Sequence, residues 1–325
     1  MKISTKVALI LSVLMLLAGG SLIYMSLYRA GFDWDKLTIN EAFETYDYTV
    51  PGKIHDVHIE SKHVDVHVLR STTSVCNVRS KSASRDCCSV ETDDDMLIVK
   101  CSEDSSYPWY KRIWRQDNTE LYVFLPEQEY ETLTITAGSG DVYVSDALSF
   151  ASADVKTGSG DQEFFAPVLE SLTVTSSSGD ITVKRNSCKK ITAVNSSGLV
   201  FCSDCRCGEV SVTTSSGTIN VSKCKIESVS ANTASGEIEL SQINVSGTLK
   251  ASSSSGNILY MYSSAGEINI ISKSGDVVGW VIEPMLYDVR SDSGDVVLPS
   301  SGGSHHCTIR TGSGDVSFVE REYTP

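Results

Sequence analysis

A Ser-Gly motif, usually followed by an acidic residue, recurs every 19 or 20 residues through the last two thirds of this 325-residue chain. Its glycines are Gly140, Gly160, Gly179, Gly198, Gly217, Gly236, Gly256, Gly275, Gly294 and Gly314. Such regular spacing over this length indicates one supersecondary unit stacked on copies of itself, which is typical of a solenoid. The repeat therefore constrains the architecture, whereas function must be argued from a particular site.

The residues around each glycine predict two short β-strands per repeat. Two and four residues after the glycine the side chains are mostly apolar, as at Ile181 and Val183, with a mainly polar or small residue between them. A second alternating pair lies before the glycine, as at Leu172 and Val174. Alternation with period two indicates strands with one buried face. We therefore predict an all-β, single-stack parallel β-solenoid of about 11 coils, in which the glycine provides a backbone bend.

A degenerate coil is predicted upstream of the motif. Residues 57–68 align on the coil that contains Gly179 with each inward position matched, and Val64 stands in the place of the glycine. Residues 70–130 form an irregular insertion, in which two short runs flank residues 93–95 as in a β-hairpin. We expect the strand array to begin with the degenerate coil.

The N-terminal segment, residues 7–28, carries no charge, and a helix of this length can cross a hydrocarbon core of about 30 Å. Lys2 and Lys6 precede it, so the positive-inside rule places the bulk of the chain outside the cytoplasm. A cleaved signal peptide is the alternative. The expected organisation is a cytoplasmic tail (1–6), a transmembrane signal anchor (7–28), a linker (29–50), the degenerate coil with a cysteine-containing insertion and cap (51–130), and the regular solenoid (131–325).

Ten cysteines in a chain with an export signal favour an oxidising compartment and some disulfides. Cys188 and Cys207 both lie nine residues after their glycines, and Cys205 and Cys224 both lie seven residues after theirs. Each pair is therefore expected to stack on adjacent coils near the distance of a disulfide bond.

The other cysteines fall into two groups. Cys202 and Cys307 occupy inward positions and are expected to be buried thiols. The insertion contains four more, whose pairing stays open: Cys76, Cys87, Cys88 and Cys101. A zinc site at Cys202, Cys205 and Cys207 is disfavoured, because alternation turns Cys202 inward and places the other two in a loop.

The motif acids predict a stripe along one edge of the rod. They are Asp141, Asp161, Asp180, Glu237, Asp276, Asp295 and Asp315. Calcium-binding repeats supply six or more oxygens per ion, whereas each coil here supplies one acid, and Leu199, Thr218 and Asn257 interrupt the row. We therefore expect these side chains to bond the turns and to solvate the rod.

Three further function classes are disfavoured by the sequence. The net charge of −14 argues against a nucleic-acid partner. The outward acids have no evident base beside them, so we predict no enzymatic activity, no catalytic residues and no cofactor. Four histidines cluster in the first strands: His55, His58, His63 and His67. His58 and His67 are both predicted to face outward, which would permit a metal site on the surface. We prefer the interpretation that these histidines are solvated.

The insertion contains the most unusual local composition of the chain. Its candidate interaction patch comprises Trp109, Tyr110, Lys111, Arg112, Trp114 and Arg115. One interpretation is a cap over the open end of the solenoid. The other is contact with lipid headgroups or an anionic wall polymer.

The order of parts resembles the bacterial putative-adhesin family of β-strand repeat proteins, a domain of unknown function. The resemblance rests on the N-terminal apolar segment, the degenerate strand pair, the insertion, the Leu-Tyr-Val-Phe-Leu-Pro strand at residues 121–126 and the serial Ser-Gly-Asp-Val coils, and it covers residues 40–320. It implies a surface-exposed solenoid with an adhesin role and no catalytic residues. The many cysteines and the aromatic-basic insertion depart from the family pattern.

Together these features predict a single-pass membrane protein with an extracytoplasmic, non-enzymatic solenoid that is an adhesive or structural element of the cell envelope. Its expected partners are the membrane, through the N-terminal helix, and an envelope polymer or protein ligand. A membrane-anchored envelope sensor is the alternative, and a polysaccharide-active enzyme is a third class.

Overall fold

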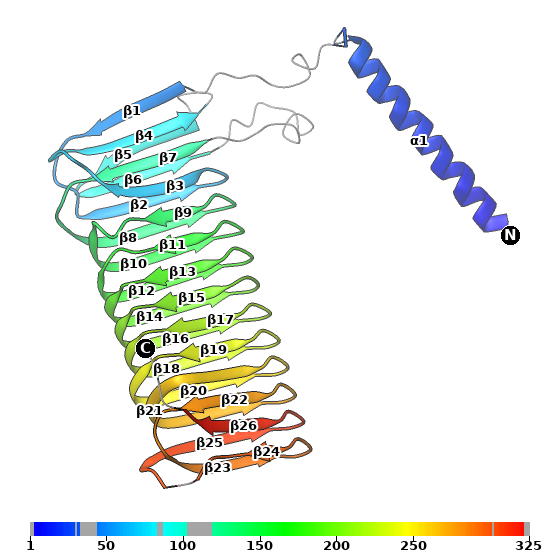
Figure 1. Ribbon diagram of the computed structural model, residues 1–325. Helices are drawn as coiled ribbons and strands as arrows, with labels where there is room; N and C mark the ends of the chain where they lie inside the picture. The colour runs from blue at the N-terminus through cyan, green and yellow to red at the C-terminus, as the bar shows by residue number, and fades with distance from the viewer. Residues whose placement is uncertain are drawn as a thin grey trace.

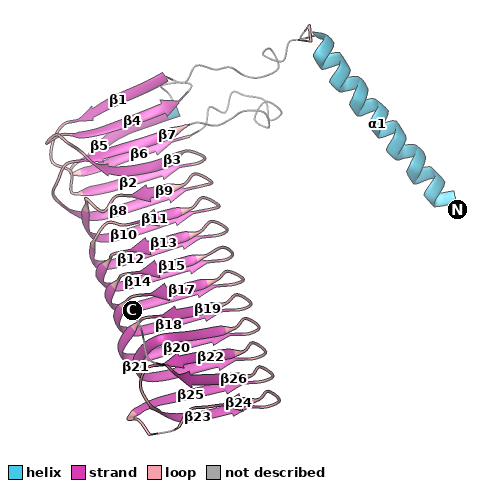
Figure 2. Cartoon of the chain, in the orientation of Figure 1, coloured by secondary structure: helices cyan, strands magenta, loops and turns pink. Residues whose placement is uncertain are grey.

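The computed structural model describes residues 3–29, 31–32, 44–82, 87–102, 119–300 and 302–321. Apart from the helix α1 (Ile3–Arg29), its regular elements are β-strands that stack into a long parallel solenoid (Figure 1). The strands belong to two ladders, called ladder A and ladder B, which are joined by turns along the whole rod (Figure 2). The predicted all-β parallel solenoid is confirmed.

In each regular coil a strand of ladder B precedes the motif glycine and a shorter strand of ladder A follows it. Ladder B contains β8 (Glu129–Ala137), β10 (Ser149–Thr157), β12 (Val168–Ser176), β14 (Ser187–Asn195), β16 (Arg206–Thr214), β18 (Lys225–Thr233) and β20 (Asn244–Ser253). Ladder A contains β9 (Val142–Val144), β11 (Gln162–Phe164), β13 (Ile181–Lys184), β15 (Val200–Ser203), β17 (Ile219–Ser222) and β19 (Ile238–Ser241). The long strand β21 (Ile258–Ser272) pairs with β19 in ladder A and with β20 in ladder B.

Neighbouring strands are paired so that equivalent positions of successive repeats stack. Ile181 pairs with Val200, and Leu172 pairs with Ile191. The inward side chains of both ladders form one continuous core, in which Ile181, Ile219 and Ile238 are completely buried. Burial of each such side chain contributes roughly 1.5–3 kcal/mol.

The motif glycines are required by the close stacking of the turns. A Cβ atom on Gly160 would lie 1.9 Å from the carbonyl oxygen of Gly140, and one on Gly236 would lie 1.8 Å from that of Gly217. These contacts are with backbone, which cannot rotate away as a side chain could. Among the motif glycines, all of which are described, only Gly198 has a positive φ, of 111°. The chain bends at these glycines as predicted, but at the other nine it is the close approach of the neighbouring turn, rather than left-handed backbone, that requires glycine.

Buried hydroxyl groups support the same turns. The backbone N–H of Gly217 donates to Thr214 Oγ1 at 2.9 Å, and the Gly256 N–H donates to Ser253 Oγ at 2.8 Å. Asn195 takes this place in the coil of Gly198, and its amide instead donates to the carbonyl of Gly179 at 2.8 Å. These bonds satisfy buried turn amides that would otherwise be costly.

The return turns from ladder A to ladder B use left-handed backbone at residues other than glycine. These residues are Arg185, Asp204, Lys223, Gln242 and Tyr262, with φ between 49° and 56°. Each left-handed residue costs roughly 1–2 kcal/mol, so the paired strands on both sides must impose the conformation. Sequence reasoning missed these turns because no glycine marks them.

At the N-terminal end, the degenerate coil is confirmed as β2 (Asp56–Ser61) and β3 (Asp65–Arg70). Val57 pairs with Leu133 and Val66 pairs with Val142, so this coil stacks directly on β8 and β9. The insertion is more regular than predicted: β6 (Met96–Cys101) and β7 (Glu120–Leu125) stack outside it on β2 and β3 as a further parallel coil.

Antiparallel strands cover that outermost coil. In ladder A, β4 (Cys76–Ser82) pairs with β7, and β1 (Glu44–Val50) pairs with β4. In ladder B, β5 (Cys88–Asp93) pairs with β6, which confirms the predicted hairpin. The expected linker therefore ends earlier than residue 50, since β1 belongs to the sheet. Antiparallel cover protects an end whose strand edges would otherwise be open.

At the C-terminal end, the coils do not stack in chain order. The last two strands are β25 (His305–Thr311) and β26 (Val316–Glu320). In ladder B, β25 lies between β21 and β23 (Met285–Ser291). In ladder A, β26 lies between β22 (Val277–Val281) and β24 (Val296–Val297) (Figure 1). The coil of Gly294 is thus the outermost one. Val296, predicted to point into the core, is 42% exposed for this reason.

Glycine and phenylalanine are matched at this exchange of order. Gly279 pairs with Phe318, and a Cβ atom on Gly279 would lie 2.3 Å from the Phe318 ring. Gly279 occupies an inward position that is apolar and larger in other coils. The missing side chain therefore makes room for the ring from the inserted strand.

The predicted N-terminal helix is present as α1, but its assignment as a transmembrane span is not supported. Within the described part of the chain, no helix combines the length and the apolar character needed to cross a membrane.

The turn stacking predicts that Gly236→Ala lowers the free energy of unfolding by about 3 kcal/mol, because the added methyl group meets backbone. Gly302→Ala is the matched control, because no atom lies within 4 Å of its added Cβ. Urea unfolding of the two variants measures the difference. Equal unfolding midpoints would contradict the steric role of the motif glycine.

The exchanged coil order predicts that Gly279→Leu destabilises the protein by about 2 kcal/mol through overpacking against Phe318. Adding Phe318→Ala should recover part of that loss, giving a favourable coupling in a double-mutant cycle. If the coils stacked in chain order, Gly279→Leu would fill space and stabilise the fold. Thermal unfolding of the single and double variants distinguishes the two arrangements.

Candidate functional site

Aromatic side chains gather on the outer face of ladder A near the N-terminal end of the rod. The His67 ring of β3 stacks on the Tyr122 ring of β7, with ring centroids 4.8 Å apart. Tyr122 also stacks on Phe124 at 6.1 Å, and His67 lies 6.2 Å from Tyr143 of β9. Tyr143 meets Phe165 edge to face at 5.6 Å. All five side chains are partly exposed, so they form a surface rather than a core.

Two cations extend this surface. The Arg79 guanidinium lies 5.7 Å from the centre of the Phe124 ring, and the Lys184 ammonium lies 5.9 Å from Phe165 and 5.3 Å from Phe201. Such cation–π contacts stabilise by roughly 0.5–1 kcal/mol at exposed sites. We define the aromatic band as the six rings that these contacts connect: His67, Tyr122, Phe124, Tyr143, Phe165 and Phe201.

The band is confined to one part of the outer face. In the next two coils the position of Phe201 is occupied by Asn220 and Glu239, which are hydrogen-bonded to each other at 2.7 Å. The sequence contains every ring of the band but gives no sign that β7 lies beside β3. Sequence reasoning therefore missed the band, because Tyr122 and Phe124 come from the insertion, whose position in the stack the repeat pattern does not predict.

The patch predicted in the insertion, Trp109, Tyr110, Lys111, Arg112, Trp114 and Arg115, lies outside the described residues. Its role remains a prediction of the sequence.

The motif aspartates form a hydrogen-bonded ladder across the turns. Asp141 Oδ1 accepts from the backbone N–H of Asp161 at 2.8 Å, and Asp161 Oδ1 accepts from that of Asp180 at 2.8 Å. Asp65 begins the row by accepting from the Asp141 N–H at 2.9 Å. Asn257 Oδ1 makes the same bond to the Asp276 N–H at 3.0 Å. The aspartates therefore act in turn chemistry, as predicted, and the described residues contain no group of three His, Cys, Asp or Glu arranged to hold a metal ion.

The N-terminal histidines do not converge. His58 Nε2 lies 2.9 Å from Glu60 Oε1 on ladder B, whereas His67 stacks in the aromatic band on ladder A. His63 Nδ1 contacts Ser139 Oγ at 2.7 Å. The shared outward parity of His58 and His67 was misleading, because the two strands that carry them belong to different ladders.

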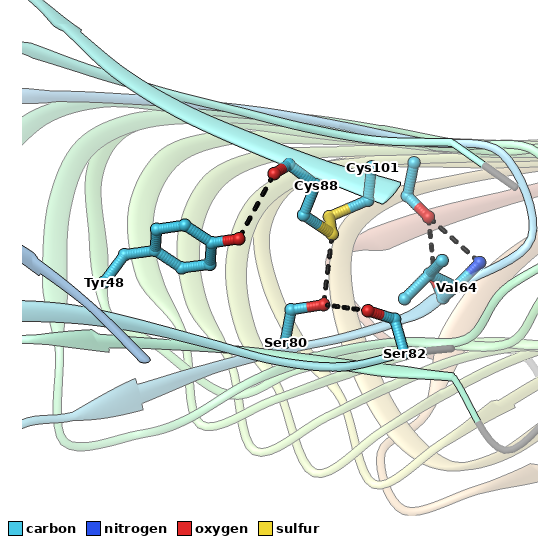
Figure 3. Close-up of a disulfide and its surroundings, with 7 residues drawn as sticks. Tyr48, Val64, Ser80, Ser82, Cys88 and Cys101 are labelled. Atoms are coloured by element: carbon cyan, nitrogen blue, oxygen red, sulfur yellow. Dashed lines mark hydrogen bonds between the residues drawn. A yellow bond between two sulfur atoms is a disulfide. The ribbon is translucent and has the colours of Figure 1, made fainter. Parts of the chain in front are cut away.

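A disulfide links the covering hairpin of ladder B. Cys88 and Cys101 are directly opposite in the β5–β6 pair and are bonded (Figure 3). Ser80 Oγ donates to Cys88 Sγ at 3.2 Å, and the Tyr48 hydroxyl donates to the Cys88 carbonyl at 3.5 Å. Two of the four insertion cysteines therefore pair, and the bond ties β5 to the end of the stack.

The cysteines of the regular coils gather at one corner of the solenoid. Cys188 and Cys207 are partners in the β14–β16 register, and their sulfur atoms lie 3.4 Å apart as thiols. The backbone N–H of Cys205 donates to Cys224 Sγ at 3.3 Å. The predicted stacking of Cys188 on Cys207 is therefore confirmed. Cys202 and Cys307 are buried thiols, as predicted, and burial raises the pKa of Cys307 to about 12.

Two of the hollows on the surface of the described residues lie near features named above. A cleft of about 440 Å³ at the N-terminal end is lined by Arg70, Glu127 and Tyr130, among others. A groove of about 680 Å³ on the ladder B side is lined by Cys188, Lys189 and other residues of β14 and β16. The Tyr130 hydroxyl donates to the Pro126 carbonyl at 2.8 Å, which gives it a structural partner beside the first cleft.

The fold defines a repeat protein built on a parallel β-solenoid. The family model described as Toastrack DUF4097 matches residues 54–319, and the chain belongs to this family. No curated protein matches the chain.

Several solved structures are similar to the chain at low identity. A putative adhesin from Bacteroides fragilis is 13% identical, with 86% of this chain and 98% of that chain covered and a TM-score of 0.40. A putative lipid binding protein from Parabacteroides distasonis is 17% identical, with 86% and 98% covered and a TM-score of 0.44. A putative adhesin from the same species is 15% identical, with 74% and 98% covered and a TM-score of 0.49.

The aspartate ladder predicts that Asp161→Ala lowers the free energy of unfolding by about 1 kcal/mol, because the Asp180 N–H loses its acceptor. Asp161→Asn should be nearly neutral, since Asn257 makes the equivalent bond in its own coil. Urea unfolding measures both changes. An equal loss in the two variants would assign the effect to the charge rather than to the hydrogen bond.

Proposed function

We propose that this protein is a non-enzymatic, surface-exposed β-solenoid that binds an extended polysaccharide of the cell envelope along its aromatic band. In this role it is an adhesive or structural element. The single observation that carries the proposal is the connected contact of five partly exposed rings, extended to Phe201 through Lys184, across coils that are far apart in sequence.

The shape of the band suits an extended ligand. Successive coils of a parallel ladder are about 4.8 Å apart, so rings that follow the ladder form a row along the rod, in which some rings are stacked and others are tilted or edge to face. Aromatic faces stack on the apolar faces of ring-shaped ligands, and each such contact contributes roughly 1–3 kcal/mol in the well-studied case of nucleobases. Sugar rings offer comparable apolar faces, and the net charge of −14 argues against a nucleic acid.

Charged groups of both signs border the band. Arg79 lies over Phe124 and Lys184 lies over Phe165 and Phe201. Arg79 is paired with Asp47 at 2.7 Å, and Glu120 accepts from the Tyr122 hydroxyl at 2.9 Å. The border therefore offers both donors and acceptors to the hydroxyl groups of a sugar polymer.

The disulfide supports a location outside the cytoplasm. The bond between Cys88 and Cys101 requires an oxidising environment to persist. A cell-surface position would give the band access to envelope polymers.

The proposal predicts that Tyr143→Ser combined with Phe165→Ser weakens binding of the full chain to purified envelope polysaccharide by at least about tenfold, since two stacking faces are lost. Leu259→Ser combined with Val278→Ser is the matched control, because these side chains pair on the outer face of ladder A beyond the band. Co-sedimentation with the insoluble polymer measures both affinities. The control should bind as the unmodified chain does.

Other outcomes would overturn the proposal. Equal binding by both double variants would remove the band from the interaction. Release of soluble sugars during the incubation would indicate an enzyme instead. Failure to bind polysaccharide together with capture of a membrane protein through the band would favour the sensor class.

A further inference from the structure

Five cysteines from three successive coils gather at the corner where ladder A returns to ladder B. They are Cys188, Cys202, Cys205, Cys207 and Cys224, and none is more than 7% exposed. They lie apart from the aromatic band, which covers the outer face of ladder A. Their sulfur atoms have no part in the proposed polysaccharide binding.

The sulfur atoms form a chain of contacts in which Cys207 is central. Cys188 Sγ lies 3.4 Å from Cys207 Sγ, and the two residues are opposite each other in adjacent parallel strands. The side chain of Cys205 lies beside those of Cys207 and Cys224, and its thiol donates to the Ser203 carbonyl at 3.3 Å. Neighbouring strands hold these contacts in register, so the sulfur atoms approach one another without any movement of the backbone.

The hydrogen bonds make Cys207 the acidic member of the group. The hydrogen bond between the Cys188 and Cys207 side chains lowers the pKa of Cys207 and raises the pKa of Cys188. A thiolate is the form of cysteine that attacks disulfides.

Cys188 lines the groove of about 680 Å³ on the ladder B side, although the residue is only 6% exposed. Lys189 and Arg206 at the rim are balanced by Glu209 and Glu227 of the same lining, and Lys189 is paired with Glu170 at 2.6 Å. The groove is therefore the side from which a small external disulfide would approach Cys188. Cys205 and Cys224 do not line this groove and are each 1% exposed.

We propose that Cys188 and Cys207 form a thiol–disulfide exchange site that reacts with the disulfide of a small thiol compound through this groove. Cys188 sulfur attacks one sulfur of the incoming disulfide after passing its proton to Cys207, and the other half leaves as a thiolate. Cys207 then loses its proton to the solvent and attacks Cys188 sulfur, which releases the second thiolate. The external disulfide gains two electrons, and the pair is oxidised to an intramolecular disulfide between adjacent coils.

The consequence is a covalent connection that forms or opens with the surroundings of the rod. The Cys188–Cys207 bond would tie β14 to β16 on the surface of the groove. Cys205 and Cys224, which the spacing also pairs, are shielded from an external disulfide while the protein is folded. The two pairs therefore differ in reactivity although their positions in the repeat are similar.

The test exposes the reduced full chain to oxidised glutathione, stops the reaction with acid and locates the disulfides by peptide mass mapping. We expect loss of two thiols with Cys188 bonded to Cys207, at a rate at least about tenfold above the reaction of the buried thiol Cys307. Cys188→Ser and Cys207→Ser should each abolish the intramolecular bond, and Cys307→Ser should leave its formation unchanged.

Two results would overturn the proposal. One is reaction of Cys188 and Cys207 no faster than that of Cys307. The other is a stable glutathione adduct on Cys188 that never closes onto Cys207. Polysaccharide binding is measured separately in the same samples, so failure of the exchange site and failure of the proposed function are distinguishable.

Discussion

The close stacking of backbone turns is the constraint on which the rest of this structure depends. Nine of the ten motif glycines lie so near the carbonyl oxygen of the glycine one coil away that no side chain fits between them, as Gly236 on Gly217 illustrates, and Gly140 lies equally near the carbonyl oxygen of Val64. This contact sets the stacking of the turns, and the two ladders follow it on both sides. A hydroxyl three residues earlier and an aspartate on the neighbouring coil satisfy the amides that the tight turns expose.

With the inward positions committed to the core, the outward positions are free to differ between coils. Thr182, Phe201 and Asn220 are successive partners in one ladder, yet only Phe201 is aromatic. Distinct surfaces therefore arise on one scaffold: the aromatic band on ladder A, the aspartate ladder at the glycine turns and the thiol cluster at the opposite corner. Each depends on stacking to bring together residues that are one or more repeats apart in sequence.

The two ends of the rod show how a regular stack is terminated. At one end, antiparallel strands cover the last coil, and the Cys88–Cys101 bond holds the hairpin of ladder B in place. At the other end, the final strands insert before the preceding coil rather than after it. The insertion of β6 and β7 outside β2 and β3 also contributes two of the six rings of the aromatic band, Tyr122 and Phe124, and places Tyr122 beside His67. End structure and candidate function are thus linked.

Local periodicity was enough to predict the alternating burial of Ile181, the degenerate coil around Val64 and the stacking of Cys188 on Cys207, because each depends only on equal spacing within adjacent repeats. The order of the terminal coils, the left-handed corner residues and the aromatic band required the tertiary structure. Periodicity indicates that two repeats can stack, but it does not indicate which repeats are neighbours. Phe318, for example, is buried against Gly279 only because its strand, β26, is inserted beside β22. Contacts between residues far apart in the chain depend on that choice of neighbours, which the packing energy of the whole stack determines.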